Sequence, residues 1–151
     1  MAANRGDDEV TGQSRQRFRE GGSFEDEAGY SRAVRLGHLI AVSGTTCRPE
    51  VVGLGTRGQA VDCLQRIVAA VEQLGGSRDG IYRTRLFLAP GADWREAAAA
   101  HLEVLGDVGP ANTTLFVHSL IGDGLLVEAE ADAWAEVLPQ AAKTSGSQDL
   151  S

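Results

Sequence analysis

Apolar and polar residues alternate in several short segments of this chain, which is the period of a β-strand with one buried face. The first two such segments are residues 30–36 (YSRAVRL) and residues 39–43 (LIAVS). Gly37 and His38 lie between them, and a two-residue connection that contains glycine is typical of a tight turn between strands. The pattern therefore predicts a β-hairpin.

Two other segments have the three-and-four residue spacing of an amphipathic helix. In residues 56–74 the apolar positions are Ala60, Leu64, Ile67, Val68, Val71 and Leu74. Thr56 and Gln59 have the spacing of a capping box, so we expect them to open this helix. Residues 94–105 (WREAAAAHLEVL) are predicted to form the second helix, with a second capping box that begins at Asp93.

Three further segments have the pattern of strands: residues 81–88, 112–117 and 125–137. Alternation within the first of them places Arg83 and Arg85 on one face. The order strand, strand, helix, strand, helix, strand, strand predicts an α+β fold in which two helices cover one face of the sheet. The other face also carries apolar residues, so we expect self-association to cover it.

The chain has 151 residues, of which 42% are hydrophobic, and these values fit one domain that buries roughly two-thirds of its unfolded surface. Residues 1–22 and residues 139–151 are polar and nearly free of large apolar side chains. Such segments bury too little surface to offset the entropy of ordering. The sequence therefore predicts a disordered N-terminal tail over 1–22, a folded domain over 23–138 and a disordered C-terminal tail over 139–151.

A formal net charge of -7 disfavours a general affinity for nucleic acid or for an anionic membrane, because either polyanion would be repelled. The N-terminus has no apolar signal region, and the sequence has no run of about 18 apolar residues. We therefore expect a cytoplasmic protein. Cys47 and Cys63 lack the spacing of a zinc site, so neither a metal nor another cofactor is predicted.

Several motifs in order along the chain resemble the Rid (YjgF-like) family of reactive-intermediate deaminases. They are YSRAVRLGHLIAVSGTT, EQLGG at the end of the first helix, RTRLFL, PANTT and LLVEAEADA. The resemblance implies a chorismate-mutase-like mixed sheet, assembled as a homotrimer with ligand clefts between subunits. It also implies hydrolysis of small, unstable enamines or imines to ketones and ammonia, without a cofactor.

The resemblance also implies roles for particular residues. Glu128 falls on the glutamate that orients or activates water in active members, and is the predicted catalytic residue. The cleft residues that it implies are Tyr30, Ser43, Gly44 and Thr114. Asn112 falls where active members carry an arginine that grips the substrate carboxylate, and an amide cannot reproduce the two-point contact of a guanidinium. Arg85 lies on the strand face opposite the helices and is a further candidate for such a contact, but an exposed or structural ion pair is the favoured interpretation.

Two functions follow from this departure at Asn112. In the first, the protein is an enzyme for an imine or enamine that is neutral or whose carboxylate is placed differently, with Asn112 and Thr114 as polar contacts and Glu128 as the acid/base group. It is then not a general 2-iminoacid deaminase. In the second, the trimer binds a small molecule without turning it over and has a regulatory or protective role.

Overall fold

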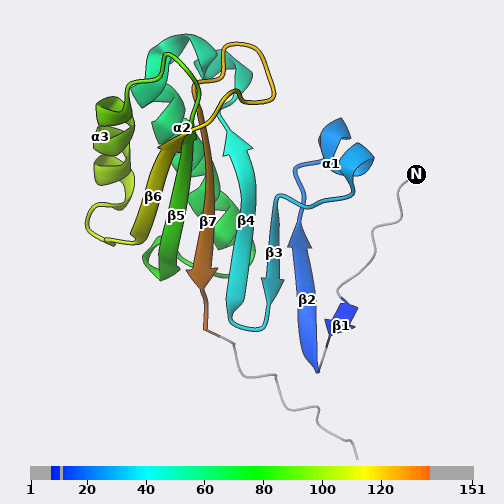
Figure 1. The fold of residues 1–151 in the computed structure, drawn as a ribbon. Coiled ribbons are helices and arrows are strands. Elements are labelled where there is room, and N and C mark those ends of the chain that lie inside the picture. Colours follow the sequence, from blue (N-terminus) through cyan, green and yellow to red (C-terminus); the bar gives the residue numbers. More distant parts are fainter. Residues whose placement is uncertain (1–7, 11, 137–151) are drawn as a thin grey trace, which may run out of the picture.

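The structure is a computed structural model, which describes residues 8–10 and 12–136. A seven-stranded mixed sheet forms its centre, with the strand order β1-β2-β3-β4-β7-β5-β6 (Figure 1). The strands are β1 (Asp8–Val10), β2 (Gln13–Phe18), β3 (Ala33–Leu36), β4 (Leu39–Thr46), β5 (Ile81–Leu88), β6 (Ala111–Phe116) and β7 (Val127–Trp134). The helices are α1 (Ser23–Ala28), α2 (Gly55–Gln73) and α3 (Trp94–Leu105), with short 3-10 turns at Pro49–Leu54 and Arg78–Gly80.

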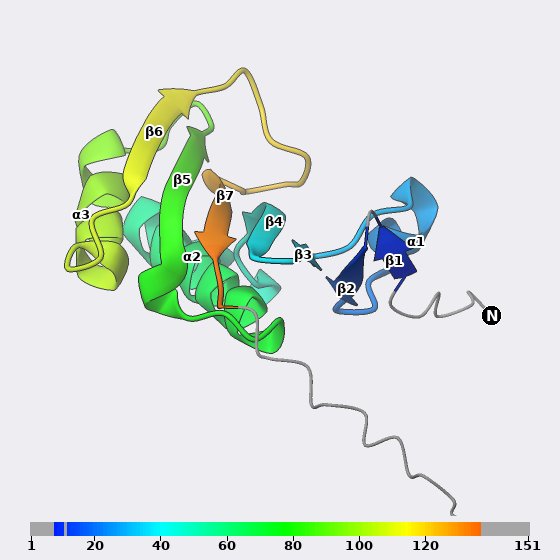
Figure 2. The same ribbon diagram turned by 90° about the horizontal axis from the view of Figure 1, so that it is seen from below.

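The two long helices, α2 and α3, pack on the same face of the sheet and leave the opposite face uncovered, while the short α1 lies beside β1 and β2 (Figure 2). The core lies between the helices and the sheet. Its largest buried apolar side chains are Ile40, Leu64, Ile67, Val71, Ile81, Leu86, Leu88, Leu105 and Val127. This arrangement confirms the predicted α+β fold with two helices on one face.

Strand β7 shows how strictly the two faces differ. Its alanines, such as Ala129 and Ala131, are buried beneath the helices, whereas Glu128, Glu130 and Asp132 alternate with them on the face without helices. We call this second face the open face. A strand with alanine on one side and carboxylates on the other thus packs closely against α2 and presents acid groups on the open face.

Strand β6 lies at the edge of the sheet and pairs in parallel with β5. A parallel pair needs a crossover connection, which α3 supplies. In this register Asn112 lies opposite Thr84, and Thr113 lies opposite Arg85. Asn112 therefore shares the helix side of the sheet with the buried Thr84, while Thr113 shares the open face with Arg85.

The predicted N-terminal tail of residues 1–22 requires a correction. Residues 13–18 form β2, which pairs antiparallel with β3, and residues 23–28 form α1. Main-chain hydrogen bonds to a neighbouring strand order this polar segment, and Phe18 packs against the core. Residues 1–7 and the predicted C-terminal tail over 139–151 lie outside the described residues.

The predicted capping box of α2 is wrong. The hydroxyl oxygen of Thr56 accepts a hydrogen bond from the Asp93 amide at 3.0 Å, which ties α2 to the start of α3. The buried Gln59 side chain donates to the Gly124 carbonyl and accepts from the Leu126 amide. Both side chains thus make tertiary contacts that local spacing does not reveal. Asp93 does cap α3, because its carboxylate accepts from the Arg95 amide at 2.8 Å.

Within the part of the chain that the structure describes, no helix is long and apolar enough to cross a lipid bilayer.

Candidate functional site

A cavity of about 440 Å³ opens on the open face, between the N-terminal strands and β7. It is lined by Arg15, Arg17, Gly29, Tyr30, Ser31, Val34, Ala41, Val42, Ser43, Arg85, Glu130, Ala131 and Asp132. Three residues singled out from the sequence, Tyr30, Ser43 and Arg85, therefore meet in one cavity although they come from three different parts of the chain.

Glu128 and Gly44 do not line this cavity, but they lie close to Glu130 and Ser43 on the same strands, which do line it. The register between β4 and β7 is irregular between Val42 and Thr45, and Glu128 lies opposite Thr46 just beyond the irregularity. A Cβ atom on Gly44 would collide with the Glu128 carboxylate, because that carboxylate occupies the space that a side chain would need. The absence of a side chain at Gly44 thus leaves room for the Glu128 carboxylate, and Gly44 has no side chain with which to contact a ligand.

The environment of Glu128 raises the pKa of its carboxyl group. Burial is the largest cause, because it disfavours the charged form, and the neighbouring Glu130 acts in the same direction. The guanidinium group of Arg32 opposes both effects. Glu128 is therefore a half-buried carboxyl group that holds a proton more readily than an exposed glutamate, which is a property of groups that take part in proton transfer.

The sequence did not single out Arg32, which shapes the backbone beneath Glu128. Arg32 is 9% exposed, and its Nη1 donates to the Gly44 carbonyl at 2.6 Å and to the Thr45 hydroxyl at 3.1 Å. The Ser43 amide and hydroxyl both donate to the Arg32 carbonyl. Arg32 and Ser43 thus fix the irregular part of β4 from both ends.

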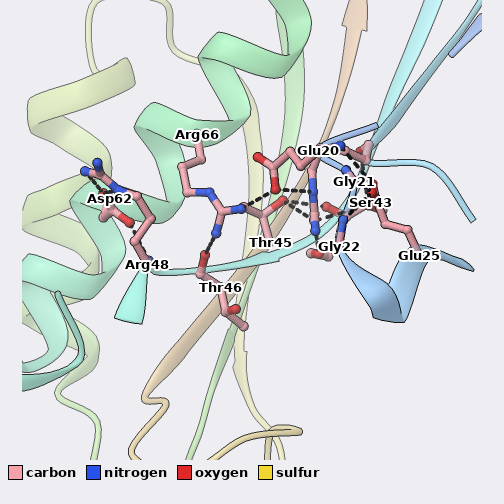
Figure 3. Close-up of polar contacts among 12 residues, drawn as sticks. Glu20, Gly21, Gly22, Glu25, Ser43, Thr45, Thr46, Arg48, Asp62 and Arg66 are labelled. Carbon is pink, nitrogen blue, oxygen red and sulfur yellow. Dashed lines mark hydrogen bonds and ion pairs between the residues drawn. The ribbon is translucent and has the colours of Figure 1, made fainter. Parts of the chain in front are cut away.

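A carboxylate from the N-terminal segment completes this network (Figure 3). Glu20 forms ion pairs with Arg32 at 3.5 Å and with Arg66 of α2 at 2.5 Å. Arg66 also donates to the Thr46 carbonyl, at the point where β4 faces Glu128. Charge alone did not mark Arg32 in the sequence, because the same hairpin also carries Arg35 and the partners of Arg32 come from other segments.

Arg85 forms an ion pair, which is the interpretation that the sequence favoured. Its Nη1 lies 2.9 Å from a carboxylate oxygen of Glu130 and 3.6 Å from one of Asp132. These contacts cross between β5 and β7 on the open face. Arg85 lines the cavity, but acidic side chains of the same chain already engage its charge.

Asn112 and Thr114 lie elsewhere, on the helix side of β6. The Asn112 amide donates to the Thr84 hydroxyl at 3.1 Å and accepts from the Thr114 hydroxyl at 2.9 Å. Thr84 in turn lies 2.8 Å from Nε2 of His101 on α3, and burial lowers the pKa of His101, which favours the neutral ring. Strand β5 separates this pair from Glu128. Within one subunit, the sequence-derived site residues therefore form two groups.

The larger group can position a small polar molecule beside a proton-transferring carboxyl group. The described residues contain no set of three or more His, Cys, Asp or Glu side chains placed to hold a metal ion. Both cysteines have reduced nucleophilic character, because burial raises the pKa of the Cys47 and Cys63 thiols. The described groups in and beside the cavity are thus hydroxyl groups, side chains of both charges and one carboxyl group with a raised pKa.

Substitution of Gly44 by alanine tests the seating of this carboxylate. We expect Gly44→Ala to cost less than about 1 kcal/mol of stability, because the flexible end of Glu128 can move aside. The rate of a reaction in which Glu128 transfers protons is expected to fall at least tenfold. The added methyl group displaces the carboxylate, and a displacement of about 1 Å from a productive geometry lowers a catalytic rate strongly. Thermal unfolding and initial rates measure the two effects. Gly53→Ala is the control, because a Cβ atom there meets nothing within 4 Å.

The fold and the sequence together define the class of this domain. The sequence profile of the family described as "Endoribonuclease L-PSP" matches residues 22–135. The chain belongs to this family, which confirms the family resemblance drawn from the sequence motifs. The crystal structure of Rv2704 from Mycobacterium tuberculosis, a member of the YjgF/YER057c/UK114 family, is similar with a TM-score of 0.75 and 39% identity, and the match covers 81% of this chain and 100% of that one.

Two other proteins illustrate the breadth of the similarity. An uncharacterized protein of Streptomyces coelicolor, SCO2049, is 29% identical over 128 residues, which is 83% of this chain and 96% of that protein. The structure of Escherichia coli TdcF with bound serine has a TM-score of 0.64 and 21% identity, and the match covers 71% of this chain and 88% of that chain. The likeness to TdcF concerns the fold alone.

Proposed function

We propose that this protein hydrolyses a small, unstable imine or enamine whose imine carbon does not stand next to a carboxylate. The observation that carries the proposal is the half-buried Glu128 carboxyl group, which lies on Gly44 with a raised pKa and beside the cavity. Hydrolysis of an imine requires a water molecule held against an electrophilic carbon and a group that manages its protons. Glu128 supplies this group.

The polar wall of the cavity supports a small-molecule substrate. Tyr30 and Ser43 offer hydroxyl groups, while Arg85, Glu130 and Asp132 supply both signs of charge. TdcF, which has the same fold, binds serine in its crystal structure, and this agrees with a ligand of comparable size. The net charge of -7 opposes the binding of RNA, the substrate named in the description of the family.

The same proposal requires a second copy of the chain. Asn112 and Thr114 lie on the opposite side of the sheet from Glu128, at the edge strand β6. They contribute to a cleft with Glu128 when β6 of one subunit approaches the open face of another, as in a homotrimer. The open face also exposes Leu39, Leu115 and Trp134, which suits a subunit interface. Light scattering tests this requirement, and a monomer would contradict it.

The experiment follows ammonia release from three freshly generated imines. In the first the carboxylate is attached to the imine carbon, in the second it lies four carbons away, and the third has none. We expect acceleration of the second or third substrate, little acceleration of the first, and loss of acceleration in Glu128→Gln. If no imine is hydrolysed faster than in buffer, the alternative holds, namely a non-catalytic trimer that binds a small molecule.

Substitution at Asn112 tests why the first substrate is disfavoured. We expect Asn112→Arg to accelerate hydrolysis of the imine with the adjacent carboxylate by about ten- to one-hundredfold, because a bidentate charge-assisted contact stabilises the bound carboxylate more than an amide does. Asn112→Lys is the control, since it adds the charge without the planar fork of donors. Equal gains in both variants would contradict the bidentate contact, and no gain in either would count against Glu128 as a competent catalytic group.

A further inference from the structure

Two arginines of the cavity wall, Arg15 and Arg17, come from β2. This strand lies before residues 22–135, the part of the chain that matches the family profile. The two side chains point to the same face because they are two residues apart on one strand. The N-terminal strand thus brings positive charge to a cavity whose other polar walls come from the family domain.

The side chain of Arg15 has one buried hydrogen-bond donor that lacks an acceptor within the described chain. Its Nε atom is buried, and no hydrogen-bond partner for it exists among the described residues. A buried donor without a partner is costly, and a guanidinium group has no way to lose its charge at physiological pH. The position therefore calls for an acceptor that the described chain does not itself provide.

The acidic groups of the cavity do not fill this role. Glu130 and Asp132 lie against Arg85, at 2.9 Å and 3.6 Å. In the sheet register, Arg15 lies between Asp8 of β1 and Leu36 of β3, and Leu36 lies opposite Leu39 of β4, but the Arg15 Nε atom has no hydrogen-bond partner among the described residues. The missing partner of Arg15 is thus an anionic oxygen, and a carboxylate fits a guanidinium best because two parallel hydrogen bonds form.

The register also separates Arg15 from Glu128. Leu39, in the row of Arg15, lies opposite Trp134 at the end of β7. Glu128 lies at the other end of β7, six residues away, which is about 20 Å along the strand before the reach of the two side chains is subtracted. The cavity wall between them includes Tyr30 and Ser43. A molecule that is anchored at Arg15 and reaches Glu128 is therefore extended.

We propose that the cavity binds an extended organic acid, with its carboxylate held by Arg15 and its other end directed toward Ser43 and Glu128. This inference rests on the proposed function and names its substrate class: acids in which several carbons separate the carboxylate from the reacting end. A short iminoacid anchored at Arg15 leaves its imine carbon far from Glu128. The neutral Asn112 is compatible with such a substrate, because the carboxylate is held elsewhere.

Equilibrium binding of adipate, a six-carbon dicarboxylate, tests the inference without any turnover. We expect calorimetry to detect adipate binding to the wild-type protein and at least tenfold weaker binding to Arg15→Gln. Binding to Arg57→Gln, which removes the same charge from an exposed pair with Glu103 on the helix side, is expected to stay within twofold. The uncharged 1,6-hexanediol and the short acetate ion are expected to bind at least tenfold more weakly than adipate.

Three results would overturn the inference: no adipate binding by the wild-type protein, equal binding by Arg15→Gln, or equal binding of 1,6-hexanediol. A change in the oligomeric state of Arg15→Gln with unchanged adipate affinity would assign Arg15 to a subunit interface instead. If Arg15→Gln does not fold, Arg15→Lys replaces it, with weakened binding expected from the loss of the planar fork. Because no ammonia is measured, failure of the imine assay and failure of this test are distinguishable.

Discussion

Glu128→Gln is expected to lower the rate of imine hydrolysis by about 10² to 10⁴-fold, the usual contribution of a positioned acid/base group. Glutamine keeps the shape of the side chain on Gly44 but neither takes nor gives a proton at neutral pH. Initial rates of ammonia release on the accelerated substrate measure the effect. Glu72→Gln on α2 is the matched control, because Glu72 lies outside the cavity and is exposed.

The same substitution is expected to stabilise the protein at neutral pH. Because the pKa of Glu128 is raised in the folded state, the folded protein holds a proton that the unfolded chain has released. The folded state therefore loses stability as pH rises from the ordinary glutamate value through the raised one. Glu128→Gln should remove this loss, so its midpoint of thermal unfolding should exceed that of the wild type at pH 7 and match it near pH 4.

Two results would contradict the role of Glu128. Unchanged activity in Glu128→Gln would exclude it as the acid/base group. The second result would be a midpoint of Glu128→Gln that lies below that of the wild type at pH 7 but not at pH 4. The pKa of Glu128 would then be lowered in the folded protein rather than raised, because attraction to Arg32 would outweigh burial. The combined expectation, lower activity with higher stability, is typical of a functional group held in an unfavourable environment.

Arg32→Met is expected to reduce the free energy of unfolding by about 2 to 4 kcal/mol. The variant leaves the Gly44 carbonyl, the Thr45 hydroxyl and Glu20 without the donor that now contacts them. Buried acceptors that lose their donor cost more than the hydrogen bond itself contributed. A loss of this size lowers the unfolding midpoint by about 6 to 12 °C for a domain of this length. Urea denaturation and thermal unfolding measure it.

The variant also probes the link between this network and the site. Loss of the Arg32 cation should raise the pKa of Glu128 further, because its attraction now favours the ionised form. Arg57→Met is the control, and we expect it to cost less than about 1 kcal/mol, because its pair with Glu103 is exposed. A loss below about 1 kcal/mol in Arg32→Met, or an unchanged pKa of Glu128, would show that the network does not support the site.

Much of the fold was predictable because its signals are local. The hairpin of β3 and β4, helix α3 and strand β5 follow from the period of apolar residues and from turn and cap residues. Strand β2 was missed because it is polar, and its order depends on main-chain pairing with β3 rather than on burial of its own side chains. Gln59 was misassigned for a related reason, since its partners Gly124 and Leu126 lie far along the chain.

The residues of the candidate site also divide into those that sequence motifs indicated and those that only tertiary contacts revealed. Motifs along the chain indicated the family, and the resemblance made Glu128 the predicted catalytic residue. Spacing along the chain did not reveal that Gly44 makes room for the Glu128 carboxylate or that Asn112 is bound to Thr84 on the other side of the sheet. These facts depend on the β4 irregularity and on the parallel register of β6.

The sequence by itself therefore determined the fold class and the family, because periodicity and ordered motifs act over a few residues at a time, and the family resemblance made Glu128 the predicted acid group. The tertiary structure alone decided which groups line the cavity near Glu128. Arg15, Tyr30, Ser43 and Arg85 meet only because β2, β3, β4, β7 and β5 lie side by side in an order that differs from their order in the chain. Strand pairing between distant segments fixes that order, and its register sets what the site can bind.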